Sequence, residues 1–474
     1  MKPSLIRNTT FSIAFVLVSC FPFARQIQPR DQGWDALPGI LARIVPPSFP
    51  DRDFDVTQFG AVGDGKKDCT DAFREAIDKC SASGGGRVVV QRGIYLTGAI
   101  HLKDNVNLHI AKGATIRFST DPTKFLPVVY TRWEGVECMN YSPLIYAFEQ
   151  KNIAITGEGI LDGQGAPASW WSWSGKSQHG WKEGMSDQRK SRKALFEMAE
   201  QNVPVQRRVF GEGHYLRPNF VQPYKCKNVL ISGVTFKNSP MWFIHPVLCQ
   251  NVTVLGVTVE GLGPNNDGCD PESSTDVLIK ECLFNTGDDC IAIKSGRNAD
   301  GRRVNVPSQN IVVQNCVMKD GHGGVVIGSE MSGGVRNVYA EGCTMDSPNL
   351  DRALRIKTNS VRGGFVEGVF MRDIVVGEVA DAVVNINFYY EEGDAGRFPP
   401  VVRNIHLKNV KSKKSPYAVW IKTYAHYPAS DIYLEACDFD GVAKANVIEN
   451  VTGLHFADVR INGKIVTPDG KGLR

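Results

Sequence analysis

The dominant pattern in this sequence is a short run of alternating apolar and polar residues that recurs along most of the chain. Each copy opens with Asn, Asp or Gly, continues with an apolar residue and then alternates with period two. Clear copies are KNVLISGVTF from residue 227, QNVTVLGVTV from 250, QNIVVQNCVM from 309 and RNVYAEGCTM from 336. The copies start 22 to 36 residues apart, with no helical pattern between them. One short strand per repeat at such a spacing predicts a solenoid of strands.

One position of the repeat is apolar in every copy. Alternation puts every second side chain of a strand on its inner face, and the sixth residue after the opening Asn is always Val, Ile or Cys. These residues are Val234, Val257, Cys282, Cys316, Cys343, Ile374, Val410, Cys437 and Val459. Because cysteine alternates there with valine and isoleucine, we interpret these cysteines as small buried hydrophobes and not as disulfide partners. The fold predicted is an all-β, right-handed, single-stranded parallel β-helix.

The segment before the repeat predicts a helix that begins near Thr70, with Thr70 or Asp68 as its cap. Its apolar residues fall on one helical face, and they are Ala72, Phe73, Ala76, Ile77 and Cys80. A solenoid needs a cover over its first open coil. We expect this helix to supply the N-terminal cap.

The N-terminus has the pattern of an export signal. A basic segment, MKPSLIR, precedes the apolar run FSIAFVLV, which is too short to span a bilayer. Residues 17–20, Leu-Val-Ser-Cys, also resemble a bacterial lipoprotein cleavage box, which would leave a lipid on Cys20. We therefore expect an exported protein, either periplasmic, anchored in a bacterial outer membrane through Cys20, or secreted.

Four segments follow from these patterns. They are a signal peptide over 1–20, a linker over 21–50, a parallel β-helix domain over 51–465 and a tail over 466–474. The 474 residues are 42% hydrophobic and 22% charged, which is ordinary globular composition. The net charge of +4, without a dense basic stripe, does not favour nucleic acid as a partner. No later stretch is apolar enough to cross a membrane, and we expect a monomer.

About fifty residues are inserted between the copies that start at 151 and 227. The insertion carries WWSWSG, HGWKEG and the charged run DQRKSRK. Long loops on a solenoid often form binding walls, and aromatic faces suit sugar rings. We expect Trp170, Trp171, Trp173 and Trp181 to form part of such a wall; the alternative is that they pack the loop onto the solenoid.

Three acidic residues come together when consecutive coils are superposed on their strand starts. Stacked coils are about 4.8 Å apart, so Asp267 on one coil should lie beside Asp288 and Asp289 on the next, with His322 one coil further. Asp288 and Asp289 can share a cleft only at a turn or bulge, which Gly287 permits. The superposed windows are NNDGCDP (265–271), GDDCIAI (287–293) and GHGGVVI (321–327).

Clustered carboxylates have more than one chemical interpretation. Crowding raises the pKa of one member, so that one acid stays protonated while another stays ionised, as glycoside hydrolysis requires. A calcium site and turn-capping aspartates are the alternatives. The alignment across coils, with a histidine in line, favours catalysis. In RALRIKTN, one coil further on, Arg355 and Lys357 share a strand face and are placed to hold an anionic substrate such as a sugar carboxylate.

These motifs resemble those of the polygalacturonases, the family 28 glycoside hydrolases that cut pectin. The family pattern is Asn-Thr-Asp, Gly-Asp-Asp, Gly-His-Gly and Arg-Ile-Lys, and it is matched in order at 265–267, 287–289, 321–323 and 355–357. The opening FGAVGDG looks like the N-terminal signature of the same β-helix superfamily. The resemblance covers roughly residues 50 to 465.

The resemblance implies a role for each residue. Asp288 would be the general acid, and Asp267 and Asp289 would position and deprotonate the attacking water, with inversion at the anomeric carbon. His322 would support the protonation of Asp288. Substrate-binding residues would be Arg355, Lys357, Asn265 and a tyrosine, either Tyr389 or Tyr390. No metal or other cofactor is implied.

One residue departs from the family pattern: Asn266 stands where the family has Thr, and it is expected to affect the water or the first sugar site. The implied reaction is hydrolysis of α-1,4-galacturonosyl bonds in a pectic oligo- or polysaccharide. Exo action is expected, with the Trp-rich insertion and the extra residues of SGRNADGRRVNVPSQN blocking the non-reducing end. The alternatives are a rhamnogalacturonan hydrolase of the same family, a pectate lyase and a non-catalytic glycan-binding β-helix.

Overall fold

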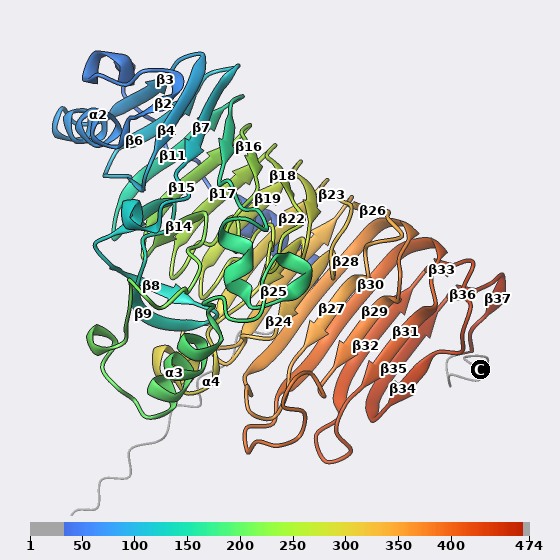
Figure 1. The fold of residues 1–474 in the computed structure, drawn as a ribbon. Coiled ribbons are helices and arrows are strands. Elements are labelled where there is room, and N and C mark those ends of the chain that lie inside the picture. The colour runs from blue at the N-terminus through green and yellow to red at the C-terminus, as the bar shows by residue number, and fades with distance from the viewer. Residues whose placement is uncertain (1–32, 468–474) are drawn as a thin grey trace, which may run out of the picture.

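The alternating segments form strands that stack in parallel, and the chain winds into an elongated β-helix (Figure 1). The computed structural model describes residues 33–467. The predicted fold is confirmed. The predicted signal peptide, including Cys20, and most of the predicted tail lie outside the described residues.

Each coil adds strands to three faces that run along the length of the molecule. The first face is built from β1 (Asp53–Asp55), β3 (Gly86–Val90), β6 (Val106–Ile110), β11 (Lys151–Gly157), β15 (Lys227–Ser232), β17 (Gln250–Leu255), β19 (Thr275–Lys280), β22 (Ser308–Gln314), β25 (Val335–Glu341), β28 (Phe365–Glu378), β30 (Val401–Lys414), β32 (Ala429–Glu435) and β35 (Val451–Ala457).

The second face contains shorter strands. They are β2 (Asp64–Asp68), β4 (Gly93–Thr97), β7 (Ala114–Phe118), β12 (Ile160–Asp162), β16 (Thr235–Lys237), β18 (Thr258–Gly261), β20 (Leu283–Thr286), β23 (Val317–Met318), β26 (Thr344–Met345), the ends of β28 and β30, β33 (Asp438–Phe439) and β36 (Arg460–Ile461), which pairs antiparallel with β37 (Lys464–Ile465).

The third face carries the predicted site residues. Its strands are β5 (Ile100–His101), β10 (Ile145–Phe148), β14 (Val221–Tyr224), β21 (Ile291–Ile293), β24 (Val325–Gly328), β27 (Arg352–Lys357), β29 (Ala382–Asn387), β31 (Tyr417–Lys422) and β34 (Val447–Glu449). Single bridges through Ile244 and Cys269 continue the stack between β14 and β21. This face is therefore in register from the first coils to the last.

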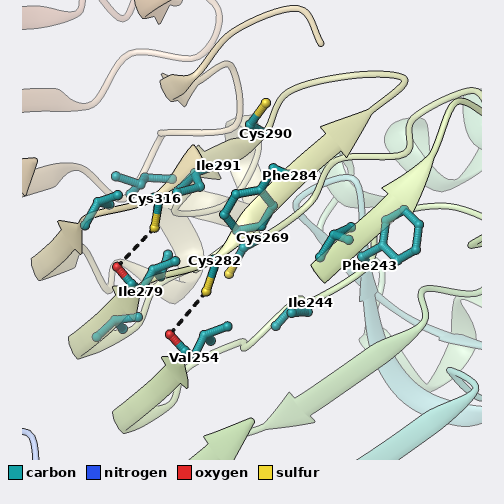
Figure 2. Close-up of a cluster of buried hydrophobic side chains, with 14 of the residues drawn as sticks. Phe243, Ile244, Val254, Cys269, Ile279, Cys282, Phe284, Cys290, Ile291 and Cys316 are labelled. Carbon is teal, nitrogen blue, oxygen red and sulfur yellow. Dashed lines mark hydrogen bonds between the residues drawn. The ribbon is translucent and has the colours of Figure 1, made fainter. Parts of the chain in front are cut away.

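The inward positions of the repeat form the core. All nine predicted positions, from Val234 to Val459, are almost completely buried. Figure 2 shows Cys282 and Cys316 in this core, with thiols directed at the carbonyl oxygens of Val254 and Ile279 in the neighbouring coils. The eleven described cysteines are all free and buried. The interpretation of these cysteines as buried hydrophobes is confirmed.

The asparagine that opens each repeat has a conformational role. Asn228, Asn251, Asn310 and Asn337 all have positive φ values between 55° and 59°, a region that asparagine tolerates better than most residues. Their side-chain amides also form hydrogen bonds from coil to coil: Asn251 donates to Asn228 at 2.8 Å and Asn337 donates to Asn310 at 3.1 Å. The ladder satisfies polar groups at each turn and fixes the register between coils.

The N-terminal end of the solenoid is covered as predicted. Helix α2 (Thr70–Ala82) buries the five predicted apolar residues against the first coils. The carboxylate of Asp68 accepts hydrogen bonds from the backbone N–H and the hydroxyl of Thr70. The cap is visible in blue at one end of the molecule in Figure 1.

Part of the predicted linker has structure of its own. Residues 33–44 contain η1 (Gly33–Ala36) and α1 (Leu37–Leu41). Leu37, Ile40 and Ile44 pack on the outer surface of the first face. This segment therefore adds a strap to the side of the β-helix.

Two insertions and a hairpin lie beside the third face. The hairpin is β8 (Val129–Trp133) and β9 (Val136–Asn140), which pairs with β13 (Val209–Phe210). Helix α3 (Arg189–Glu200) belongs to the Trp-rich insertion, and α4 (Asn298–Val304) to the second predicted insertion. The two helices lie side by side (Figure 1). Among residues 33–467, no helix is long and apolar enough to cross a membrane.

Replacement of Asn310 tests the role of the asparagine ladder. Its φ is 57°, it donates to the Asp276 carboxylate at 2.9 Å and it accepts from Asn337. Asn310→Ala loses these bonds and keeps an unfavourable φ, so we expect a loss of about 2–3 kcal/mol of unfolding free energy. Asn310→Gly loses the same bonds without the conformational cost, so it should be about 1 kcal/mol more stable than the alanine variant. Urea denaturation measures the unfolding free energy of both variants. Equal stability of the two would contradict the role assigned to the positive φ of Asn310.

Candidate active site

Asp267, Asp288 and Asp289 meet on the outward side of the third face. Asp267 lies two residues before the bridge residue Cys269, and Asp289 lies two residues before the paired residue Ile291. One carboxylate oxygen from each of the three aspartates lies within 4.8 Å of the others. The predicted meeting of acids from neighbouring coils is therefore present in the structure.

Asp288 and Asp289 share the cleft because the chain bends between β20 and β21. Gly287 in this bend approaches the backbone of the previous coil: a Cβ atom there would lie 2.4 Å from the carbonyl oxygen of Gly263. A side chain at residue 287 would push the two coils apart. Glycine is needed there for close approach, and not for an unusual φ.

Asp288 forms a hydrogen bond with His322 on the next coil. The His322 Nδ1 atom lies 3.0 Å from Asp288 Oδ1. Burial opposes ionisation of Asp288, but the His322 hydrogen bond and the positive charges of His322, Lys357 and Lys294 outweigh it and hold the pKa of this carboxyl below its usual range. The same hydrogen bond raises the pKa of His322. In the free protein the proton of this pair lies on His322.

Asp289 is held by the two predicted cations. The Asp289 carboxylate is fully buried, with Lys357 Nζ at 2.6 Å and Arg355 Nη1 at 3.2 Å. Both side chains come from β27, two coils further along. They can reach Asp289 because the intervening coil presents glycine at 323 and 328. Asp289 is thus a fixed anion beside a pair of cations.

Tyr390, and not Tyr389, faces this cation pair. The Tyr390 ring centroid lies 5.3 Å from Lys357 Nζ and 5.6 Å from Arg355 Cζ. Tyr389 is 43% exposed and packs edge-on against Tyr424. The choice that the sequence left open is therefore resolved by the geometry.

Asp267 belongs to a buried charge cluster that the sequence analysis missed. Lys294 Nζ lies 3.4 Å from Asp267 Oδ2, 3.4 Å from Asp270 Oδ1 and 3.5 Å from Glu330 Oε2. The Trp242 ring covers the ammonium group at 4.4 Å. Burial raises the pKa of Asp267 well above its usual value and that of Asp270 to about 8, although Lys294 opposes both shifts. Both carboxyl groups are therefore better proton acceptors than an exposed aspartate.

The turn before Asp267 is fixed by two asparagines. Asn265, with φ of 55°, accepts a hydrogen bond from the buried Arg217 at 2.7 Å. The Asn266 side chain is completely buried and binds only backbone groups: it accepts from Gly263 and donates to the carbonyls of Ser239 and Met241. The expectation that Asn266 affects the water or the first sugar site is wrong, because its amide points into the turn.

Asp267 and Asp288 line a cleft of about 450 Å³, whereas the fully buried Asp289 and its partner Arg355 are not among the residues that line it. Its surface includes the predicted residues Asn265, Asp267, Asp288, His322, Lys357 and Tyr390. It also includes Lys176, Arg189 and Arg192 from the Trp-rich insertion, and Glu330 and Glu391 from the segments that follow β24 and β29. Most of the lining side chains are thus polar or charged.

The Trp-rich insertion forms one wall, but its tryptophans do not face the cleft. Trp170 is buried in the core, the Trp171 indole donates to the Ser239 carbonyl, and Trp173 packs on Tyr141 and Trp170. Trp181 packs within the insertion, where its indole donates to the Met185 carbonyl at 2.9 Å and its ring lies under Arg189. The expectation of a sugar-stacking aromatic wall is wrong, because three of the rings anchor the loop to the solenoid and the fourth packs inside the loop. Trp242, which the sequence analysis did not single out, lines the cleft instead.

The charges around the three aspartates favour acid/base chemistry over the calcium interpretation. Lys357 and Arg355 neutralise Asp289, His322 pairs with Asp288, and Lys294 pairs with Asp267. A divalent cation would have to compete with these groups. The arrangement instead gives the three carboxyl groups different charged partners at one site, as a division of acid and base roles in glycoside hydrolysis requires.

A carboxyl cluster of this kind on a parallel β-helix defines a glycoside hydrolase. Residues 208–460 match the family model for glycosyl hydrolases family 28. The chain belongs to this family.

Solved structures and curated relatives agree with this assignment. The chain is similar to the crystal structure of a hyperthermoactive exopolygalacturonase from Thermotoga maritima, with 48% identity and a TM-score of 0.88 over 91% of this chain and 96% of that one. An exo-poly-alpha-D-galacturonosidase of Dickeya chrysanthemi is 26% identical over 87% of this chain and 75% of its own length. A probable polygalacturonase of Vitis vinifera is 28% identical over 83% and 75%.

The hydrogen bond between Asp288 and His322 predicts that the raised pKa of His322 depends on Asp288. Because the Asp288 carboxylate stabilises the imidazolium, the pKa of His322 lies above 6.5 in the wild type and should fall in Asp288→Asn. NMR titration of the imidazole resonances measures both values. His179 is an internal control, since burial lowers its pKa without a contribution from Asp288. An unchanged His322 pKa in Asp288→Asn would show that the contact does not control the proton.

Proposed function

We propose that this protein is an exo-acting polygalacturonase, which removes galacturonate from the non-reducing end of pectic oligo- or polysaccharides by hydrolysing α-1,4 bonds. The observation that carries the proposal is the position of the cation pair Arg355 and Lys357 beside the three aspartates. A guanidinium and an ammonium under an aromatic ring fit the carboxylate of an acid sugar. A sugar held there has its glycosidic oxygen next to Asp288.

The reaction follows from the charges of the three carboxyl groups. Asp288 donates a proton to the glycosidic oxygen, and the bond from that oxygen to the anomeric carbon breaks. A water between Asp267 and Asp289 attacks the same carbon and loses its proton to a carboxylate. Asp267 is the better acceptor, since its pKa is raised, whereas both oxygens of Asp289 already accept hydrogen bonds from Arg355 and Lys357.

The proton for the leaving group is held by the Asp288–His322 pair. In the free protein His322 carries it. Substrate binding displaces water and brings a negative carboxylate into the cleft. Both effects raise the pKa of Asp288 and move the proton along the 3.0 Å hydrogen bond onto Asp288.

We propose inversion at the anomeric carbon, although the spacing alone does not require it. The oxygens of the three aspartates lie within 4.8 Å, which is shorter than the roughly 6.5–9.5 Å typical of inverting enzymes. Two carboxylates, those of Asp267 and Asp289, lie near the assigned acid Asp288. Both oxygens of Asp289 already accept hydrogen bonds from Arg355 and Lys357. Asp267 and Asp289 are better suited to hold a water than to attack the sugar.

Exo action is supported by the walls on the N-terminal side of the cleft. The guanidinium of Arg297 stacks on Phe196 at 4.3 Å, and Ala299 donates to Glu200 at 3.2 Å, so the two predicted insertions pack on each other. A wall of two joined segments blocks a polymer from extending past the first sugar site. The relative with 48% identity is named an exopolygalacturonase.

Three other expectations remain predictions. The export signal and the lipid anchor at Cys20 are proposed from the sequence alone, as is the monomeric state. A rhamnogalacturonan hydrolase is not favoured, because the cation pair and His322 both fit a site for galacturonate.

Asp288→Asn tests the assigned acid. The amide keeps the shape of the side chain but cannot donate the proton, so kcat on polygalacturonate should fall about 10²- to 10⁴-fold. Release of reducing sugar measures the effect. Glu435→Gln, which changes an exposed carboxylate paired with Lys408 on the molecule's surface, is the matched control and should be unaffected. An Asp288→Asn enzyme as active as the wild type would refute the assignment.

The product profile tests exo action. Because we propose that the insertions stop the polymer beyond one terminal sugar, digestion of polygalacturonate should release monomer from the first minutes, with little loss of viscosity for each bond cleaved. Chromatography by size, run together with viscometry, gives both quantities. Mixed oligomers with a rapid fall in viscosity would instead show internal cleavage.

A further inference from the structure

The cations that line the cleft differ in whether they are already paired with an acid. Lys357 pairs with Asp289, Lys294 with Asp267, and Arg192 with Glu134 at 2.7 Å. Arg189 pairs with Asp187 at 2.7 Å. These four cations therefore each have an acidic partner in the protein, although Lys357 shares Asp289 with Arg355 and that pair keeps a net positive charge.

Lys176 is the exception among the cations that line the cleft. It is an exposed residue of the Trp-rich insertion, on the wall that closes the N-terminal side. No acidic side chain of residues 33–467 forms an ion pair with it. Its neighbour Gly175, with φ of 75°, ends the short helix η4 (Trp170–Ser174) and turns the chain toward the cleft. The ammonium group is therefore available to a ligand.

Arg217, directly behind the cleft, adds a second uncompensated charge. It is fully buried, and its guanidinium donates only to neutral acceptors: the Gln188 and Asn265 side-chain oxygens and the carbonyls of Pro240 and Pro264. Burial lowers its pKa to about 10, so it is still charged at neutral pH. Glu134, Asp288 and Asp267 act on this charge electrostatically, but none of them forms an ion pair with it. A buried cation without such a partner contributes positive potential to this end of the cleft.

Arg217 also fixes the orientation of the Asn265 amide. A guanidinium has only donors, so the oxygen of Asn265 must face it, at 2.7 Å. The Asn265 NH₂ group is then left as a donor, and Asn265 lines the cleft. The closed end of the cleft thus offers an unpaired ammonium and an oriented amide donor.

We propose that Lys176 and Asn265 bind the carboxylate of the terminal, non-reducing sugar, with Arg217 as the positioning residue. The inference rests on the proposed function, since that function places the terminal sugar at the closed end. Arg355, Lys357 and Tyr390 hold the sugar on the other side of the bond. The enzyme therefore recognises two consecutive acid sugars, and Lys176 determines the specificity for a free carboxylate on the terminal one.

The test compares two substrates on one set of variants. The substrates are α-1,4-linked digalacturonate and the same disaccharide with a methyl ester on its non-reducing sugar. Wild type should prefer the free acid roughly 10- to 100-fold in kcat/KM, the range for a hydrogen bond to a charged group. Lys176→Met should lose this preference through a higher KM on the free acid, with kcat little changed. Lys176→Arg should retain most of it.

Lys182→Met is the matched control. Lys182 is exposed in the same insertion but does not line the cleft, so this variant should behave as wild type. Asn265→Asp is a second variant: it keeps the bond to Arg217 but replaces the amide donor with an oxygen, and it should raise KM for the free acid at least tenfold. Lys176→Met with the full wild-type preference would overturn the site while leaving the proposed function intact. Wild type without activity on either disaccharide would overturn the proposed function and the site with it.

Discussion

The structure depends on a constant register between stacked coils. Each coil follows the previous one at about 4.8 Å, and the asparagine ladder and the inward Val, Ile and Cys residues hold that register along the solenoid. Residues more than twenty positions apart, such as Asp267 and Asp289, are thereby fixed side by side. A one-residue slip would turn every outward side chain inward, so the register also defines the active site.

The second requirement is charge balance across coils. Four acids, Asp267, Asp270, Asp289 and Glu330, are buried or nearly so, and each has a cation from another coil nearby. The number of cations available to each acid differs. Asp289 has two cations of its own, Arg355 and Lys357, whereas Asp267 and Asp270 share one lysine, and burial raises the pKa of both. Different environments for chemically identical groups allow one cleft to donate a proton and accept another.

Much of this arrangement could be predicted from the sequence. Period-two alternation identified the β-helix and its inward positions, and alignment of three coils placed Asp267 beside Asp288 and Asp289. The same alignment would have found Lys294, which stands at the register of Lys357 with Gly328 between them. The direction of side chains outside the repeat could not be predicted in this way.

The Trp-rich insertion and the tyrosine pair show this limit. Nothing in WWSWSG distinguishes rings that anchor a loop from rings that face a sugar, since both uses favour aromatic residues. Tyr389 and Tyr390 are adjacent and chemically identical, and only the path of the chain after β29 decides which ring covers Lys357. The central claim is that Asp267 and Asp289 hold the attacking water, and the stereochemistry of the first product is its most direct test. Proton NMR during early hydrolysis of an α-linked galacturonide should show the β anomer first; initial release of the α anomer would mean that a carboxylate attacks the sugar, contrary to this account.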